Sequence, residues 1–317
     1  GGDFQGIREA TALSVVLVIV VSIALFVQRK LLKAGRYDII KGKSMRPAMI
    51  KLRAAKYPLL IFSIIFLMLV VLTPLVIILL VSFLRAYGLP FAFENFSLVN
   101  YQKILIGNIA VTDSIKNSLF LGFGSGIVCL FLGVMLSYVI YKVKPKGSGA
   151  LETLAVLPYS LPGTVMAIGC ILAWSGAVFG ITLYNTIWII MVAYIARYLS
   201  YTLKSCSASL QQVHLSLEEA SRSCGATHMQ SLMDITLPLI KPAMVSSFFL
   251  VFLPAMRELT TSVLLYGPNS RTLGVQIQQL RVNGYMTQAA ALSVVTIAII
   301  MICNGVVKAI TKDRKGV

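Results

Sequence analysis

Charged residues are scarce in this sequence. Only 12% of its 317 residues are Asp, Glu, Lys or Arg, whereas 57% are hydrophobic. An ordinary soluble domain carries about 25% charged residues, because its surface must face water. The scarcity of charge therefore excludes a soluble protein of this length, and lipid is expected to surround most of the chain.

Six charge-poor stretches are long enough to provide seven helical crossings of a bilayer, each crossing taking roughly 20 apolar residues. Their boundaries are Glu9 to Arg29, Lys56 to Arg85, Lys116 to Lys142, Thr153 to Ala196 (two crossings with a turn near Gly176 to Gly180), Lys241 to Tyr266, and Thr287 to Lys308. The sequence therefore predicts an all-α polytopic membrane protein.

Arrangements typical of enzymes are also missing. The predicted spans hold no Ser-His-Asp arrangement and no paired carboxylates. Gly42-Lys43-Ser44 has the residues that end a phosphate-binding loop, but the first glycine that such a loop requires is not there. Cys224 and His228 have the spacing of metal ligands on a helix, but Gly225 between them predicts a turn. We expect no catalytic residue, metal site or cofactor in this chain, and any ATP and Mg would have to be bound by a partner.

Acidic residues are especially few, which leaves a net charge of +17 at pH 7. Seventeen of the 28 basic residues fall into three segments that follow predicted spans: ten from Arg29 to Lys56, three from Lys142 to Lys146, and four from Lys308 to Lys315. If the helices alternate in direction, all three segments lie on one side of the membrane. This positive-inside bias predicts that they are cytoplasmic, together with loop 211–242 and the C-terminus. The charge thus indicates topology and contact with membrane lipid, and argues against nucleic acid as a partner.

The longest polar interruption in the second half of the chain is Gln211 to Pro242. Apolar residues recur at helical spacing before Gly225, which can adopt the left-handed conformation that ends a helix. These apolar residues are Leu210, Val213, Leu217 and Ala220. Thr227 is a candidate cap for a second short helix, which Pro238 and Pro242 are expected to stop. The pattern predicts a helix–turn–helix outside the membrane.

The order of residues in this loop resembles the EAA loop of permease subunits in binding-protein-dependent ABC importers. That motif is EAA, three residues, glycine, nine residues, then I-x-L-P. The matching residues are Glu219, Ala220, Ser221 (in place of the second alanine), Gly225, Ile235, Leu237 and Pro238. In that family the loop is a coupling helix seated on a cytoplasmic ATPase. The resemblance implies a permease subunit that works with two ABC ATPase subunits, a second permease half and a periplasmic or lipid-anchored solute-binding protein.

Two predicted spans contain residues that are expensive inside a bilayer. Pro158 and Pro162 must distort the third helix of the complete unit, and the freed carbonyl groups need protein or a water-filled cavity beside them. Pro254, Arg257 and Glu258 lie about midway along the fifth helix, where a charge costs at least about 2.5 kcal/mol. We therefore interpret these five residues as candidates for the translocation pathway, with packing around a kink as the alternative for the prolines and a structural role as the alternative for Arg257.

The first predicted helix repeats part of the last one. Residues 10–25 match residues 289–304 at seven of sixteen positions, including an unbroken ALSVV, and a basic cluster follows each copy. We interpret residues 1–33 as the last helix of a preceding homologous permease half, 34–56 as a basic cytoplasmic linker, and 57–317 as a six-helix permease domain. The second permease half would then be fused N-terminally.

A second resemblance concerns the solute. Arg257 to Ile277 is similar to the corresponding stretch of ferric-iron importer permeases, which are often fused double permeases. The resemblance implies ferric iron transport across the bacterial inner membrane, with thiamine, phosphonate, polyamine and sulfate permeases as related alternatives. A different class, an ion-coupled secondary transporter or membrane-embedded enzyme, would need more titratable groups inside the spans than Glu258 and would not need an EAA loop.

Overall fold

The computed structural model of the chain describes residues 55–176 and 180–312, with side chains up to residue 305, and seven scattered helical positions between Ala12 and Val27. The predicted helix at 1–33 lies outside the described residues apart from those positions. The basic linker 34–56 also lies outside them, except for its last two residues.

The described chain is helical, with two isolated β-bridges in place of any sheet. In chain order its elements are α2 (Lys56–Leu67), η2 (Met68–Leu72), α3 (Thr73–Phe83), η3 (Phe93–Asn95), α4 (Val99–Leu105), α5 (Ile109–Tyr138), η4 (Val139–Val143), α6 (Ser148–Ser160), α7 (Gly163–Trp174), α8 (Ile187–Leu210), α9 (Leu215–Ser223), α10 (His228–Ser231), η5 (Leu232–Thr236), α11 (Leu237–Met256), α12 (Ser262–Leu265), α13 (Leu273–Val282) and α14 (Met286–Lys312). The all-α prediction is confirmed.

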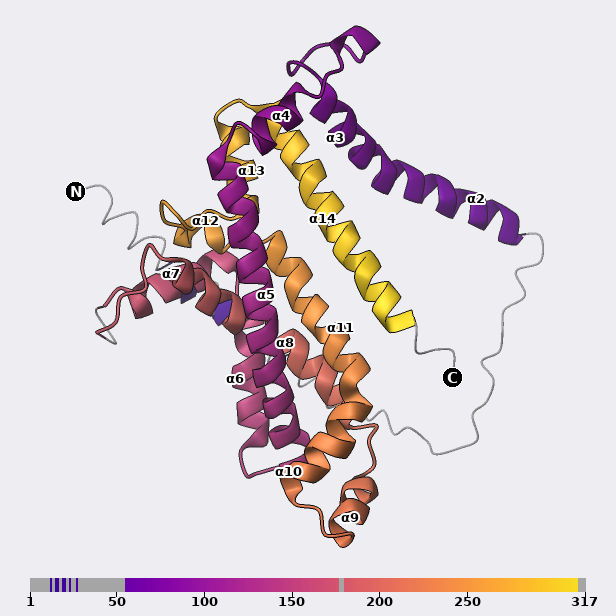
Figure 1. Cartoon of the computed structure of the whole chain (residues 1–317), viewed down its shortest axis with the longest axis vertical. Coiled ribbons are helices and arrows are strands. Elements are labelled where there is room, and N and C mark those ends of the chain that lie inside the picture. The colour runs from indigo at the N-terminus through magenta and orange to yellow at the C-terminus, as the bar shows by residue number, and fades with distance from the viewer. Residues whose placement is uncertain are drawn as a thin grey trace.

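Helices α5, α8 and α11 pack together as the centre of the molecule (Figure 1). Glycines on α5 make this approach possible, because they leave no side chain between the helices. A Cβ on Gly122 would lie 2.9 Å from the Phe252 ring of α11, and one on Gly133 would lie 2.5 Å from Thr202 of α8.

By length and composition, four helices in the described part can cross a membrane: Lys56–Phe83, Ile109–Val143, His228–Met256 and Met286–Gly305. Helices α6 and α7 form a fifth span if the pair is counted as one, although it bends by 111° between them. Helix α8 is too polar for this criterion, but its 24 residues give a length of about 36 Å, which also spans a bilayer. Four of the six crossings predicted for the complete unit, or five with the bent pair, thus meet this criterion in the described part, and a crossing by α8 stays a prediction.

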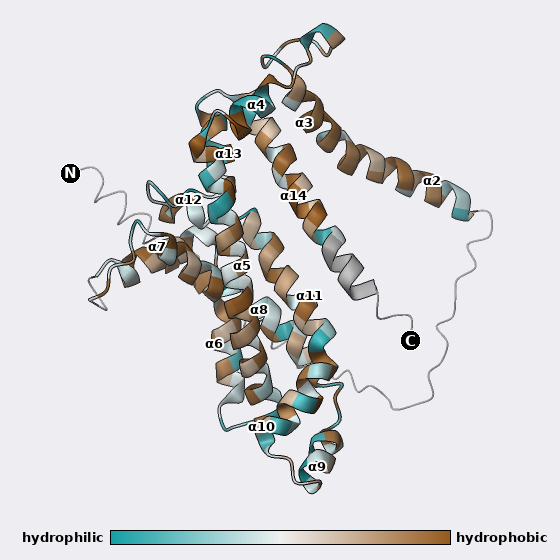
Figure 2. Cartoon of the chain, viewed as in Figure 1, coloured by the Kyte–Doolittle hydropathy of each residue, from teal (hydrophilic) through white to brown (hydrophobic). Residues whose placement is uncertain are grey.

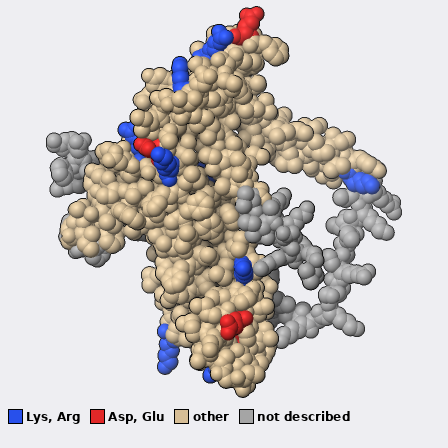
Figure 3. All heavy atoms as spheres, viewed as in Figure 1, with Lys and Arg blue, Asp and Glu red and all other residues tan. Residues whose placement is uncertain are grey.

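The arm made by α2, η2 and α3 leaves the bundle at one end, and α14 packs on its α3 part (Figure 1). Most side chains of the arm are apolar and exposed, so it is largely brown in Figure 2 apart from a teal segment at its far end, whereas α9 and α10 carry much of the polar surface. On the face in Figure 3, charge on the arm is confined to its far end. The Asn100 amide fastens the other end by donating to the carbonyls of Ser82 and Leu84, and its oxygen accepts from Thr287.

Candidate functional site

A helix–turn–helix formed by α9 and α10 lies at the opposite end of the bundle from α4 and α13 (Figure 1). Gly225 makes the turn with φ +92°, a conformation that glycine adopts at low cost. The Ala226 amide closes the end of α9 by donating to the carbonyl of Ser221. Thr227 and Gln230 then form a complete capping box at the start of α10. The predicted turn and cap are both confirmed.

One detail of the predicted loop is wrong. Pro238 and Pro242 do not end the second helix, because α10, the π-helical turn η5 and α11 run on continuously to Met256. Pro238 lies in the first turn of α11, where a missing amide proton is tolerated. The apolar residues Leu217 and Ala220 of the first helix are exposed.

The motif residues of the loop divide between its outer surface and its attachment to α11. Glu219, Ala220 and Gly225 are exposed, while Ser221 is half-buried. Ile235 and Leu237 are half-buried where η5 joins α11, next to exposed Pro238. Large apolar side chains are exposed beside the outer residues, namely Leu215, Leu217, Met229 and Met233. The turn therefore presents a mixed polar and apolar surface at the end of the bundle.

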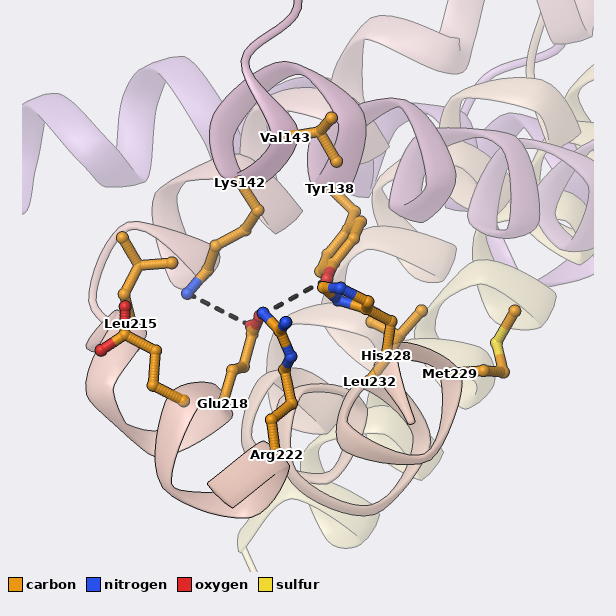
Figure 4. A pocket seen from close by; sticks show the side chains of 10 residues that line it. Tyr138, Lys142, Val143, Leu215, Glu218, Arg222, His228, Met229 and Leu232 are labelled. Carbon is orange, nitrogen blue, oxygen red and sulfur yellow. Dashed lines mark hydrogen bonds and ion pairs between the residues drawn. The ribbon is translucent and has the colours of Figure 1, made fainter. Parts of the chain in front are cut away.

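The buried residue of α9 is Glu218, which the sequence analysis did not single out. Its Oε1 accepts a hydrogen bond of 2.7 Å from Thr236 of η5 and lies 3.4 Å from Nζ of Lys142. Its Oε2 accepts a longer bond of 3.4 Å from the Tyr138 hydroxyl. Lys142 also donates to the carbonyl of Val213, just before α9. Figure 4 shows Tyr138 and Lys142 reaching toward Glu218 from the end of α5 and η4.

An open groove of about 440 Å³ separates the end of α5 from α9 and α10. The residues around it are Tyr138, Lys142, Val143, Leu215, Glu218, Glu219, Arg222, His228, Met229 and Leu232.

The sequence did contain a signal that one of the two adjacent acids, Glu218 or Glu219, faces inward. Adjacent side chains on a helix point about 100° apart, so Glu218 and Glu219 must lie on different faces of α9.

A second polar cluster lies where two helices are interrupted. Helix α11 stops at Met256, so Arg257 and Glu258 occupy a break before α12 and not the middle of a helix, as was expected. Nearby donors stabilise this break. The Ser262 hydroxyl donates to the backbone carbonyl of Glu258, and three donors from residues 260–261 donate to its Oε1. Tyr198 of α8 donates to the other carboxylate oxygen at 2.6 Å.

Arg197 of α8 joins this cluster, donating to the Thr261 hydroxyl at 3.1 Å with its Nη1 3.9 Å from Glu258 Oε1. The start of α7 closes in from another side, since Gly163 approaches Thr260 and Arg197 so closely that a Cβ there would clash with both. The cluster thus joins the break between α6 and α7 to the break after α11. Sequence analysis missed Arg197 and Tyr198, although an arginine inside an apolar helix with tyrosines at helical spacing is a recognisable signal.

The pathway candidates are only partly brought together. Pro162 lies next to Gly163 at the helix break and so adjoins the Glu258 cluster. Pro158 is inside the last turn of α6, and Pro254 is inside the last turn of α11. Arg257 is exposed and has no ion pair among the described residues.

Residues 129–315 match the family described as binding-protein-dependent transport system inner membrane component. The chain belongs to this family. It is therefore a membrane-embedded permease subunit of an ABC importer, as the resemblance of the loop predicted.

The relatives agree with this assignment. The putative 2-aminoethylphosphonate transport system permease protein PhnV of Salmonella paratyphi A is 29% identical over 231 residues, 72% of this chain and 84% of that protein. The ferric transport system permease protein FbpB of Actinobacillus pleuropneumoniae is 28% identical over 222 residues, 69% of this chain but 32% of that protein. A bacterial alginate ABC transporter in complex with its periplasmic protein has the same fold, with a TM-score of 0.64 at 19% identity over 81% of this chain and 95% of that one.

Proposed function

We propose that the α9–α10 turn is the coupling helix of this permease, the element that docks on a cytoplasmic ABC ATPase and passes its movement to the membrane helices. The observation that carries the proposal is the exposed placement of Glu219, Ala220 and Gly225 at the tip of a helix–turn–helix. A loop that served only to connect α8 to α11 would not need an exposed rim of Leu217, Met229 and other large apolar side chains.

The orientation follows from the same proposal. With the α9–α10 end in the cytoplasm, the connector holding Lys144 and Lys146 is cytoplasmic as well, in agreement with the positive-inside bias. The C-terminus would be on that side too. ATP and Mg would be bound by two ATPase subunits, and a periplasmic or lipid-anchored protein would deliver the solute.

A second permease half is part of this proposal. The arm of α2, η2 and α3 has a single buried residue, Ser82, which leaves a long apolar surface for lipid and for another half to cover. The ferric relative is much longer than the matching region, as expected for a double permease. A fused half preceding residue 34 remains our proposal for the origin of the ALSVV repeat.

For the solute we propose ferric iron, on the resemblance of residues 257–277, with 2-aminoethylphosphonate as the second candidate. The second is favoured by a specific observation, because the PhnV match covers most of both proteins. With either solute, the Glu258 cluster would form part of the pathway, since it joins two helix breaks inside the bundle. Uptake of radiolabelled ferric iron and of 2-aminoethylphosphonate by cells expressing the complete transporter separates the two.

The docking proposal is tested by purifying the tagged permease from a membrane that also contains its ATPase. We expect the ATPase to co-purify with the wild-type chain and to be lost when Leu217 and Met229 are both replaced by Asp. Replacing exposed Ile106 and Ile109, at the far end of the bundle, by Asp is the matched control. Equal recovery of the ATPase with both pairs would refute docking at the α9–α10 turn.

A further inference from the structure

The α9–α10 turn is joined to the membrane helices by two kinds of route. One is covalent, since α10 continues through η5 into α11 and residues 211–214 join α8 to α9. The other crosses the open groove to the end of α5, where α9 is reached by the side chains of Lys142 and Tyr138. Helix α9 packs on α10 and η5, so the second route depends on side chains that span the groove.

Glu218 is at the centre of this second route. It is only 8% exposed, although it belongs to a short helix whose neighbours are mostly at the surface. Its carboxylate receives Lys142 from η4 and Thr236 from η5, and its backbone carbonyl accepts from Ser231 of α10. One residue of α9 is thereby connected to η4, α10 and η5.

Lys142 completes the connection. Its ammonium group is held between the Glu218 carboxylate at 3.4 Å and the Val213 carbonyl at 2.9 Å, with its side chain only 6% exposed. Charge-assisted hydrogen bonds have a fixed geometry, whereas apolar helix surfaces slide past each other by small shear movements. Arg222 lines the same groove but is part of α9 itself, so it can neutralise Glu218 without joining α9 to α5.

We propose that the Lys142–Glu218 ion pair transmits movement of the coupling turn to α5, so that both are positioning residues for transport. The proposal rests on the proposed docking of an ATPase at this turn. It adds a route that the continuous helix from α10 into α11 does not provide. Without the pair, α9 would move with the ATPase while the end of α5 stayed behind.

Two spin-label positions test this in the complete transporter, in membranes, with and without ATP. The first is native Cys224, which is exposed on the turn, and the second is introduced by Lys146→Cys at an exposed position in the connector after η4. In the wild type we expect ATP to change the label mobility at both positions. In Lys142→Met and in Glu218→Gln, the response at Cys224 should persist and the response at position 146 should be lost.

Uptake provides the matched functional readout. We expect Lys142→Met to lower uptake of whichever labelled solute the wild type imports on the order of ten-fold, within the range of allosteric coupling energies, while the ATPase still co-purifies. Lys142→Arg should restore both uptake and the response at position 146, and Lys144→Met, which removes an exposed lysine two residues away, should change neither. The double variant Lys142→Met/Glu218→Gln should be no worse than the more damaging single variant, because the two residues act as one unit.

The outcomes distinguish the ion-pair route from the proposed docking of an ATPase at the α9–α10 turn. A response to ATP at position 146 that survives in Lys142→Met would overturn the ion-pair route while leaving ATPase docking intact. Failure of the Cys224 label to respond in the wild type would instead refute docking at this turn, and the route with it. Multiplying effects in the double variant would show that Lys142 and Glu218 act separately.

Discussion

Arg197 and Glu258 face each other across the interior of the bundle, with Nη1 and Oε1 3.9 Å apart and the Thr261 hydroxyl bonded to both. The Glu258 carboxylate also accepts from Tyr198 and from Thr260, so its lone pairs are occupied by protein donors. In this conformation the cluster holds two interrupted helices together. Contact of Glu258 with a passing solute would require some of these bonds to open.

Removing the charge of Glu258 is therefore expected to weaken the fold as well as transport. In Glu258→Ala, Arg197 and Tyr198 lose their carboxylate partner, and leaving charged groups unpaired costs about 1–3 kcal/mol. We expect a lower melting temperature in detergent and reduced uptake. The charge-deleting pair Arg197→Met/Glu258→Gln should recover part of the stability, because neither charge is left alone. A Glu258→Ala protein with unchanged melting temperature would mean that this carboxylate has no structural role.

Gly225→Val tests the turn itself. A residue with a Cβ pays roughly 1–2 kcal/mol in a left-handed conformation, and the turn has φ +92°. The membrane helices should still insert, since none of their apolar surface changes, while ATPase co-purification and uptake should be lost. Gly149→Val in α6 is the control, because nothing lies within 4 Å of its Cβ position and its φ is not positive. Normal uptake by Gly225→Val at normal expression would reduce this segment to a connector.

Glu219→Ala should weaken ATPase docking more than its exposed position suggests. The side chain lies at the middle of α9, exposed and without an ion pair among the described residues, so a cationic or donating group on the ATPase is its expected partner. The measurement is recovery of the ATPase with tagged permease at increasing salt, which screens such a contact. Glu94→Ala removes an exposed acid at the far end of the bundle and should have no effect. Identical recovery with both variants would remove Glu219 from the interface.

Packing of α5 on α8 gives a prediction that does not depend on function. Gly133→Ala places a methyl group 2.5 Å from Thr202 Cγ2, and overpacking of this kind costs about 1–3 kcal/mol. Gly169→Ala in α7 has open space around the new methyl group and should be neutral or slightly stabilising, because alanine favours a helix by up to about 1 kcal/mol. Thermal unfolding of the two purified variants provides the comparison. A drop in melting temperature for Gly169→Ala equal to that for Gly133→Ala would contradict the packing argument.

The parts of the fold that follow from composition and local geometry were accessible from the sequence. Long charge-free runs predicted the helices, and the Gly225 turn and Thr227 cap needed only nearby residues. The breaks were harder to foresee. Arg257 and Glu258 look like residues in the middle of a helix, because the donors that stabilise a break there come from Tyr198 and from the chain beyond it. Glu218 was missed for the same reason, since its partner Lys142 is 76 residues away in sequence and only tertiary packing brings them together.

The helix from His228 to Met256 has 29 residues and connects the coupling turn to the Glu258 cluster without interruption. Its length is about 43 Å, so it can act as a lever: a tilt of about 5° displaces one end by roughly 4 Å relative to the other. The π-helical turn at Leu232–Thr236, close to the coupling end, is the natural place for its fulcrum. A small rotation imposed at the turn would then be delivered, enlarged, to the carboxylate at the far end.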